Sequence, residues 1–296
     1  MTFAPFEPDP PGAPRRRFRA IPVRVLLPNL ITLLALCAGL TAIRLAFEDK
    51  LELALAAIVF AAALDGLDGR IARLIKGQSR FGAELDSLAD FVNFGCAPAL
   101  ILYLWDLNEY GNVGWIAAMV FAICGALRLA RFNVMIDDPD RPAWMGNFFT
   151  GVPAPAGAII VMLPLYLNLL GAPKAAPIIV LIYTLAIGSL MVSQLPVFSG
   201  KNVGKRVPPD MVLPLFVLVI LFIALLIAYP WWVLSIGTVC YLVCLPLGWL
   251  SFRANQRRQE VEAAEGVAAD EGTAPGSDLA PPSDPPVSSE RPARLN

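Results

Sequence analysis

The sequence predicts an all-α fold, a polytopic bundle of about eight transmembrane helices. Hydrophobic residues make up 57% of the 296 residues, and the mean hydropathy of the chain is +0.63. A water-soluble domain of this length cannot bury so much apolar surface, so much of that surface must face lipid. Apolar runs of about 20 residues, the length that crosses a bilayer, recur along the chain.

Eight apolar runs define the expected spans in order. They cover residues 27–47, 51–69, 86–106, 114–133, 152–171, 175–198, 212–228 and 231–251. The first run begins with Pro28, which a helix tolerates in its first turn because the N–H that proline lacks would have no partner there. The fifth run contains prolines and the seventh is short, so their boundaries are the least defined. An even number of spans places both chain termini on the same side of the membrane.

Basic residues are distributed unevenly between the two sides that these spans define. Of the 23 Lys and Arg residues, all but Arg44, Lys50 and Lys174 fall on the side that holds both termini. Lys and Arg are concentrated in the cytoplasmic segments of membrane proteins. The sequence therefore predicts a multi-pass protein of the inner (cytoplasmic) membrane with both termini in the cytoplasm.

The two ends of the chain differ in composition from the spans. Residues 1–20 combine prolines with arginines, and residues 253–296 are rich in Pro, Ala, Ser, Gly and acidic side chains. Such segments have too little apolar surface to build a core. We expect a disordered, basic N-terminal arm over 1–20, a membrane domain that carries the activity over 21–252, and a disordered cytoplasmic tail over 253–296.

The composition also excludes several classes of site. Histidine is absent, which removes Ser-His triads, HExxH zinc sites and imidazole bases from this chain. The five cysteines all fall within predicted spans and form no CxxC motif, so we interpret them as buried apolar residues. They are Cys37, Cys96, Cys124, Cys240 and Cys244. No nucleic-acid partner is expected.

Four carboxylates lie where a segment that only crossed the membrane would be apolar. They are Asp65, Asp68, Asp86 and Asp90 in DGLDGRIARLIKGQSRFGAELDSLAD, residues 65–90. Helical periodicity puts the first two on one face of the second span and stacks the other two on the next helix. Acidic residues within spans are energetically costly and mark functional sites. Four converging carboxylates repel one another unless hard cations neutralise them, and oxygen ligands suit Mg²⁺ or Mn²⁺.

Small residues accompany these carboxylates at Gly69, Ala72 and Gly82. They would let a bulky phosphate ligand approach the backbone. The alternative is a helical hairpin whose aspartates only pair with nearby basic residues at the membrane surface. Those basic residues are Arg70, Arg73, Lys76 and Arg80. We favour the metal and phosphate site, because simple pairing would not require small residues at this spacing.

Written as D-x2-D-G-x2-A-R-x8-G-x3-D-x3-D, the segment resembles the signature of the CDP-alcohol phosphotransferase family at every fixed position. The resemblance implies that family's helical fold and two Mg²⁺ or Mn²⁺ ions shared by the four aspartates. It also implies catalytic roles for Asp86 and Asp90, with Asp90 as the base for the acceptor hydroxyl.

The same resemblance implies contacts with the CDP portion of the donor. The motif positions that match are Gly69, Ala72, Arg73 and Gly82. A Pro-Asn-x-x-Thr beginning of the first span is common in the family near the nucleotide, which adds Asn29 and Thr32. For these two residues, initiation of the first helix is an equally good reading of the sequence.

The run LRLARFNV at the cytoplasmic end of the fourth span holds the expected acceptor residues Arg128, Arg131 and Asn133. The two arginines are three residues apart and share a helix face, so they are suited to a buried carboxylate or phosphate. Topogenic anchoring is the alternative reading. Together with NFFTGVPAPAGA at 147–158, which we expect to form a turn, this run resembles the serine-using branch of the family.

This second resemblance implies transfer of a phosphatidyl group from CDP-diacylglycerol to the hydroxyl of L-serine, with membrane lipids around a homodimer. Two alternatives stay open. A sister enzyme would use glycerol phosphate, inositol phosphate or choline as acceptor. An ion-coupled transporter would also place acids in helices, but it would need a pathway across the bilayer, and the acids here cluster at one face.

Overall fold

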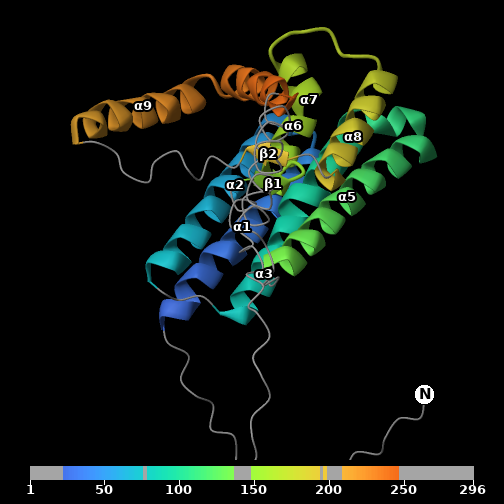
Figure 1. The fold of residues 1–296 in the computed structure, drawn as a ribbon. Coiled ribbons are helices and arrows are strands. Elements are labelled where there is room, and N and C mark those ends of the chain that lie inside the picture. Colours follow the sequence, from blue (N-terminus) through green and yellow to red (C-terminus); the bar gives the residue numbers. More distant parts are fainter. Residues whose placement is uncertain (1–22, 76–78, 137–147, 194–195, 199–208, 247–296) are drawn as a thin grey trace, which may run out of the picture. The chain divides into compact units, whose positions relative to one another are not determined.

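Helices follow all eight apolar runs in the computed structural model, which describes residues 23–75, 79–136, 148–193, 196–198 and 209–246 (Figure 1). In chain order they are α1 (Val23–Phe47), α2 (Leu51–Leu74), α3 (Arg80–Asp90), the π-helix η1 (Phe91–Cys96), α4 (Ala97–Trp105), the 3-10 helix η2 (Leu107–Tyr110), α5 (Asn112–Ile136), α6 (Ala154–Val161), α7 (Leu163–Leu169), α8 (Pro177–Val192) and α9 (Pro209–Ala228). A last described helix covers Pro230–Pro246.

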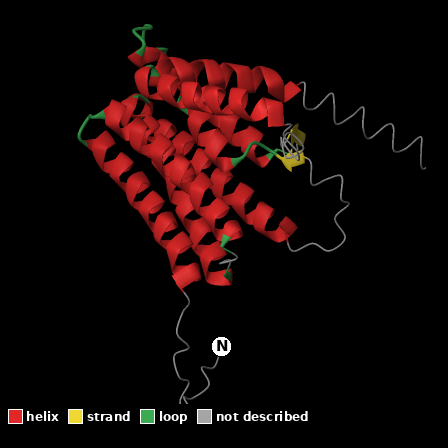
Figure 2. Cartoon of the chain, turned by 90° about the vertical axis from the view of Figure 1, so that its left-hand side faces the viewer, coloured by secondary structure: helices red, strands yellow, loops and turns green. Residues whose placement is uncertain are grey.

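The all-α prediction is confirmed, and helices dominate the chain in both views (Figure 2). The described strands are short: β1 (Phe148–Thr150) pairs antiparallel with β2 (Pro196–Phe198). The arm over 1–20, the tail over 253–296, and Lys76, Arg141, Lys201, Lys205 and Arg206 lie outside the described residues.

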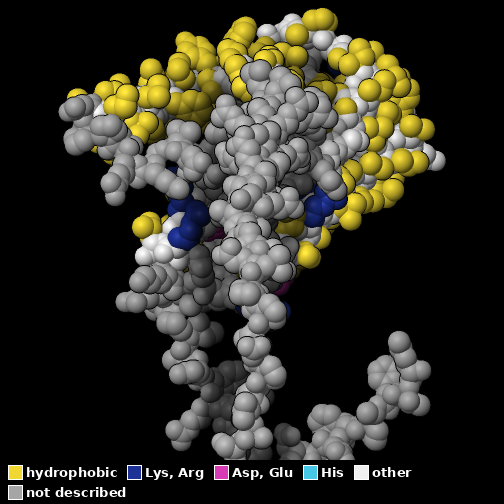
Figure 3. All heavy atoms as spheres, in the orientation of Figure 1, with side chains coloured by type: hydrophobic (Ala, Val, Ile, Leu, Met, Phe, Trp, Pro, Cys, Tyr) yellow, Lys and Arg dark blue, Asp and Glu magenta, His cyan; other side chains and the backbone are white. Residues whose placement is uncertain are grey.

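Within the described residues, four helical segments are long and apolar enough to cross a membrane by themselves. They are Leu26–Phe47, Arg80–Trp105, Asn112–Met135 and Met211–Ala228, and the shorter apolar helices Pro177–Val192 and Pro230–Pro246 accompany them. Most of the described outer surface is hydrophobic, with dark-blue basic side chains gathered below it in Figure 3. The chain is therefore an integral membrane protein, while eight spans remain a prediction.

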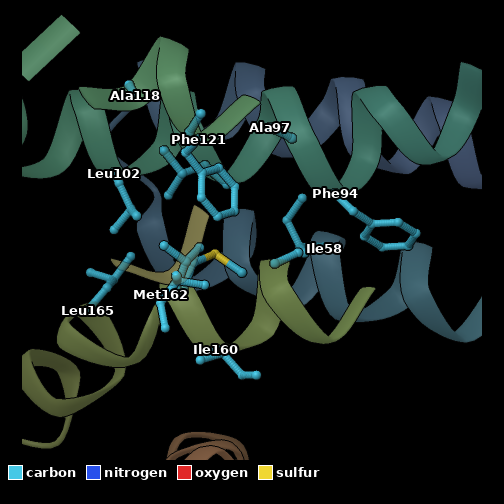
Figure 4. Close-up of a cluster of buried hydrophobic side chains, with 14 of the residues drawn as sticks. Ile58, Phe94, Ala97, Leu102, Ala118, Phe121, Ile160, Met162 and Leu165 are labelled. Atoms are coloured by element: carbon cyan, nitrogen blue, oxygen red, sulfur yellow. The ribbon is translucent and has the colours of Figure 1, made fainter. Parts of the chain in front are cut away.

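The core lies where α2, η1, α4, α5, α6 and α7 meet (Figure 4). Ile58, Phe94 and Phe121 are fully buried there. Glycines bring the central helices close together: a Cβ added to Gly125 of α5 would lie 3.4 Å from the Cα of Gly95 in η1. Small residues at such contacts let membrane helices pack backbone to backbone. This packing holds η1, the continuation of α3, in a fixed position.

A proline divides the fifth apolar run, which the sequence predicted as one span, into α6 and α7. Pro164 lies in the first turn of α7 and has no N–H to donate to the carbonyl of Ile160, four residues earlier. The Tyr183 hydroxyl of α8 donates to that carbonyl instead, at 2.8 Å. A side chain from a neighbouring helix thus satisfies the carbonyl that the proline frees.

Tyr183→Phe should lower stability by about 1 to 3 kcal/mol, the usual penalty for leaving a buried polar group without its partner. Thermal unfolding of the purified protein in detergent measures the loss. Tyr229→Phe is the matched control, because the Tyr229 side chain is exposed. An equal unfolding temperature for wild type and Tyr183→Phe would mean that another donor serves the Ile160 carbonyl.

A charged cluster joins η2 to the segment between α7 and α8. The Lys174 ammonium lies 2.8 Å from Oδ1 of Asp106 and 2.9 Å from Oε1 of Glu109, and 5.7 Å from the centre of the Trp105 ring. Asp106 is fully buried. Hydrogen bonds to Asp106 and Glu109 raise the pKa of Lys174 because they favour its charged form. The cluster lies at the far end of the Arg80–Trp105 segment from the aspartates.

Candidate metal and nucleotide site

Three of the predicted carboxylates converge from two helices. α1 packs along α2 and against α3 (Figure 1), and this packing brings together one carboxylate oxygen from each of Asp65, Asp68 and Asp86. All three oxygens lie within 4.8 Å of one another. The Asp90 carboxyl, one turn further along α3, interacts electrostatically with Asp65 and Asp86. The structure therefore gathers all four aspartates that the sequence singled out.

The beginning of α3 is fixed by a side-chain cap. The Ser79 hydroxyl accepts a hydrogen bond from the backbone N–H of Gly82 at 3.0 Å, which satisfies one of the free donors of the first turn. α3 then places Asp86 and Asp90 one turn apart on the same face. Without a break in the helical path, the chain continues into η1.

α1 contributes a polar group to the carboxylates. The Thr32 hydroxyl donates to Oδ2 of Asp68 at 2.6 Å and lies 3.1 Å from the carbonyl of Pro28. Thr32 and Asp68 are both buried, with 5% and 3% exposed. This bond orients one carboxylate oxygen of Asp68 and leaves the other available.

The donor set fits a hard divalent cation. Mg²⁺ binds oxygens at about 2.0 to 2.1 Å, so oxygens around one ion lie about 3 to 4 Å apart, and paired ions lie about 3.5 to 4 Å apart. The spread of up to 4.8 Å among three carboxylate oxygens is close to this range. Within the described part of the chain, no ion pair joins these aspartates to Arg70, Arg73 or Arg80. The surface-pairing alternative therefore has no support among those residues, and a metal is the counter-charge that suits the cluster.

A cavity of about 420 Å³ opens beside the aspartates. It is lined by all six residues that the sequence assigned to the CDP portion, together with two of the aspartates and three further residues. The lining comprises Pro28, Asn29, Thr32, Asp68, Gly69, Ala72, Arg73, Ser79, Gly82, Ala83 and Asp86. The volume is within the range of small-molecule and cofactor sites.

The glycine at position 82 keeps one wall of this cavity open. A Cβ at Gly82 would lie 2.7 Å from Oδ1 of Asn29 and 3.1 Å from Oγ of Ser79. Any larger residue would displace the Asn29 side chain. Opposite it on α2, Gly69 has no heavy atom within 4 Å of the position its Cβ would take, so its backbone is accessible to a ligand.

The three expected acceptor residues have different surroundings. Arg128 is buried, with 9% exposed, and lies 5.3 Å from the Phe132 ring. Its charge interacts with that of Asp90. Arg131 donates to the carbonyl of Val192 at the end of α8, at 2.6 Å.

Asn133, the third expected acceptor residue, is exposed and donates to the Ser87 hydroxyl at 2.9 Å. Arg131 thus holds two helices together, and Asn133 ties α5 to α3. Only Arg128 has its charge directed to the carboxylates.

Sequence reasoning missed Ser79 and Ala83 in the cavity wall. A signal for the first was available, since a serine directly before a helical run is a typical N-cap. Nothing in the sequence pattern indicates Ala83, which follows Gly82 in the first turn of α3 and also lines the cavity.

Comparison with known proteins assigns the family. The family model described as CDP-alcohol phosphatidyltransferase matches residues 25–195, which run from the first turn of α1 to the end of α8 and include all four aspartates. The chain belongs to this family. A second model, described as CDP-alcohol phosphatidyltransferase 2, matches residues 210–246. The family's fold, inferred from the aspartate motif, is thereby confirmed, and the chain is a membrane-bound transferase.

The similar proteins share one name. A Mycobacterium leprae protein named CDP-diacylglycerol–serine O-phosphatidyltransferase is 40% identical over 234 residues, covering 77% of this chain and 76% of that protein. A Helicobacter pylori protein (strain 26695) of the same name is 36% identical over 230 residues, covering 76% and 91%. One from Bacillus subtilis is 35% identical over 170 residues, covering 57% and 88%.

Proposed function

We propose that the chain transfers the phosphatidyl group of CDP-diacylglycerol to the hydroxyl of L-serine, giving phosphatidylserine and CMP. The observation that carries this proposal is a single cavity that holds every residue expected around the CDP portion and borders the aspartate cluster. The names of the relatives support serine as the acceptor. A diphosphate donor suits this site, because its charge needs cations in a partly dry environment.

The four aspartates would hold two Mg²⁺ or Mn²⁺ ions, which supply positive charge to the diphosphate and its leaving oxygen when bound. Asp65, Asp68 and Asp86 are the ligands that the geometry favours most. Asp90 takes the proton of the serine hydroxyl while that oxygen attacks the phosphorus attached to diacylglycerol. The new P–O bond forms as the bond to the CMP oxygen breaks, so CMP leaves with the electron pair.

Residues around the cavity would bind the nucleotide and phosphates. The backbone at Gly69, Ala72 and Gly82 allows close approach of phosphate oxygens, and Arg73 supplies a charge at the rim. Asn29 offers an amide to the base or ribose, while Thr32 orients Asp68. Diacylglycerol would stay among the lipids, and CDP would enter from the cytoplasmic side of the inner membrane. By resemblance the protein works as a homodimer.

A sister enzyme is the remaining alternative, because glycerol phosphate, inositol phosphate or choline could replace serine at the same metal site. The purified protein should be incubated with CDP-diacylglycerol, Mg²⁺ or Mn²⁺ and each alcohol in turn, with CMP release as the measurement. We expect release with L-serine that exceeds release with every other alcohol by at least about tenfold. Release that is greatest with another alcohol would replace serine by that acceptor.

Gly82→Ala should raise the KM for CDP-diacylglycerol about tenfold or more, because the new methyl group displaces Asn29 into the cavity. The KM for serine should stay near wild type. Gly66→Ala on α2 is the matched control, since nothing lies within 4 Å of the Cβ position at Gly66. Steady-state kinetics with each substrate varied at a saturating concentration of the other measures both constants. An unchanged donor KM in Gly82→Ala would remove the nucleotide from this cavity.

A further inference from the structure

The last described helix, Pro230–Pro246, presents hydroxyl groups to the protein interior. Ser235 and Thr238 are buried, with 5% and 2% exposed, and the hydroxyl oxygen of Tyr241 is also buried. These positions are three residues apart and fall within about 120° of one helix face. The opposite face, with Ile236 and Val243, is exposed.

None of these three hydroxyls has a hydrogen-bond partner among the described residues. Other helix hydroxyls donate to the carbonyl four residues earlier in their own helix: Thr184 does so at 2.8 Å and Ser189 at 2.8 Å. That bond is the usual way for a membrane helix to satisfy a serine or threonine. A buried hydroxyl without a partner is energetically unfavourable, so three on one face indicate that the face has a polar partner.

Arg128 of α5 lies near the same face. Its charge interacts with Tyr241 of the last described helix and with Asp90 of α3. Within the described residues, the Arg128 guanidinium makes no hydrogen bond or ion pair, and its close contact is the Phe132 ring. A buried guanidinium with five donors requires an acceptor, preferably an anion.

Together these groups match the two charged groups of an amino acid. A guanidinium binds a carboxylate with paired hydrogen bonds, and a tyrosine hydroxyl can donate one more. Hydroxyl oxygens of threonine and serine accept hydrogen bonds from an ammonium group. An acceptor held in this way would lie beside Asp90, the base of the proposed reaction. Choline has no carboxylate for Arg128 and no N–H for the hydroxyls.

We propose that the hydroxyl face of the last described helix forms the acceptor site together with Arg128: Arg128 and Tyr241 bind the α-carboxylate of the acceptor amino acid, and Thr238 binds its ammonium group. This inference rests on the proposed function. It assigns to the segment 210–246, which a separate family model matches, a part in choosing the acceptor.

The test uses Tyr241→Phe and Thr238→Val, which keep the shape of each side chain and remove one hydroxyl. Matched controls are Tyr166→Phe and Thr184→Val, because both side chains are fully buried and neither faces Arg128 among the described contacts. CMP release by the full-length protein in lipid nanodiscs is measured with L-serine and CDP-diacylglycerol varied separately. Ethanolamine, which is serine without its carboxylate, is tested as an inhibitor competing with serine.

We expect each test variant to raise the KM for serine about tenfold or more, with the donor KM within twofold of wild type. Both controls should keep wild-type constants for both substrates. Tyr241→Phe should weaken serine binding without changing the inhibition constant of ethanolamine, because only the carboxylate contact is lost.

The outcomes separate this inference from the proposed function. Wild-type CMP release with serine and an unchanged serine KM in both variants would overturn the acceptor site and leave the proposed function standing. Equal increases in serine and donor KM would overturn it too, since a general disturbance of the fold would explain them. Wild-type protein that releases CMP only with an alcohol lacking an amino-acid group would overturn both.

Discussion

Asp86→Asn and Asp65→Asn should each lower turnover by at least about a hundredfold. Each substitution removes a negative charge from a cluster whose oxygens lie within 4.8 Å of one another and leaves an amide of nearly the same shape. Losing electrostatic stabilisation of a developing charge costs about 3 to 4 kcal/mol of barrier for a single group. A missing metal ligand should cost at least as much. CMP release per correctly inserted protein is the measurement.

Glu84→Gln is the matched control, because it makes the same chemical change on an exposed residue of α3, two positions from Asp86. Its turnover should equal wild type. Binding of Mn²⁺, followed by electron paramagnetic resonance, should weaken in the two aspartate variants and not in the control. Wild-type turnover that persists in EDTA, with metal loss confirmed by elemental analysis, would contradict the metal-dependent reaction.

Lys174→Met should destabilise the protein by about 3 kcal/mol. The substitution leaves the fully buried Asp106 carboxylate without its cation, and breaking a buried pair from one side is among the costlier single changes. The effect should be at the lower end of that range, since 38% of the Lys174 side chain is exposed. Thermal unfolding in detergent gives the loss, and adding Asp106→Asn to the Lys174→Met variant should restore most of it.

Arg44→Met is the control for charge removal at an exposed pair. Arg44 contacts Glu48 at 2.9 Å with 79% of its side chain exposed, so the expected loss is below about 1 kcal/mol.

The sign of the pH dependence of this stabilisation follows from the raised pKa of Lys174. The pair contributes fully below the ordinary lysine pKa of about 10.4, and its contribution disappears as pH rises through the higher folded value. Equal losses in the Lys174 and Arg44 variants would show that the burial of Asp106 is unimportant.

The fold and the metal cluster could be predicted from the sequence because both depend on periodic patterns. Runs of about 20 apolar residues lead to helices, and aspartates three or four residues apart share a face of a helix. The division of the fifth run could not be predicted from the sequence. Pro164 alone does not decide between a kink and a break, and Tyr183, the residue that stabilises the break, lies in another helix.

The roles of the expected acceptor residues could not be predicted from the sequence pattern. Arg128 and Arg131 share a face and a residue type, yet one is directed to the aspartates and the other to the carbonyl of Val192. Arg131 binds the Val192 carbonyl because the end of α8, 61 residues further along the chain, lies beside it. The hydroxyls of the last described helix were overlooked for a similar reason, since serine, threonine and tyrosine in an apolar run are ordinary until their partners are known.

The π-helix η1 sets how far α3, with its metal-binding aspartates, is rotated about the helix axis relative to α4. Six residues, Phe91–Cys96, join the carboxylates of α3 to the core residues of α4, and a π-turn holds one residue more than an α-turn. Deleting one residue there and relaxing to α-helix would leave the direction of α3 nearly unchanged, because the π-turn accommodates that extra residue. Relaxing to α-helix with all six residues kept would instead rotate α3 by about 100° relative to α4. Such a protein would retain the whole aspartate motif and the whole core, yet its metal ligands would point away from the cavity. Among relatives, a one-residue gap between the last aspartate and α4 is therefore compatible with activity where that segment is a regular α-helix.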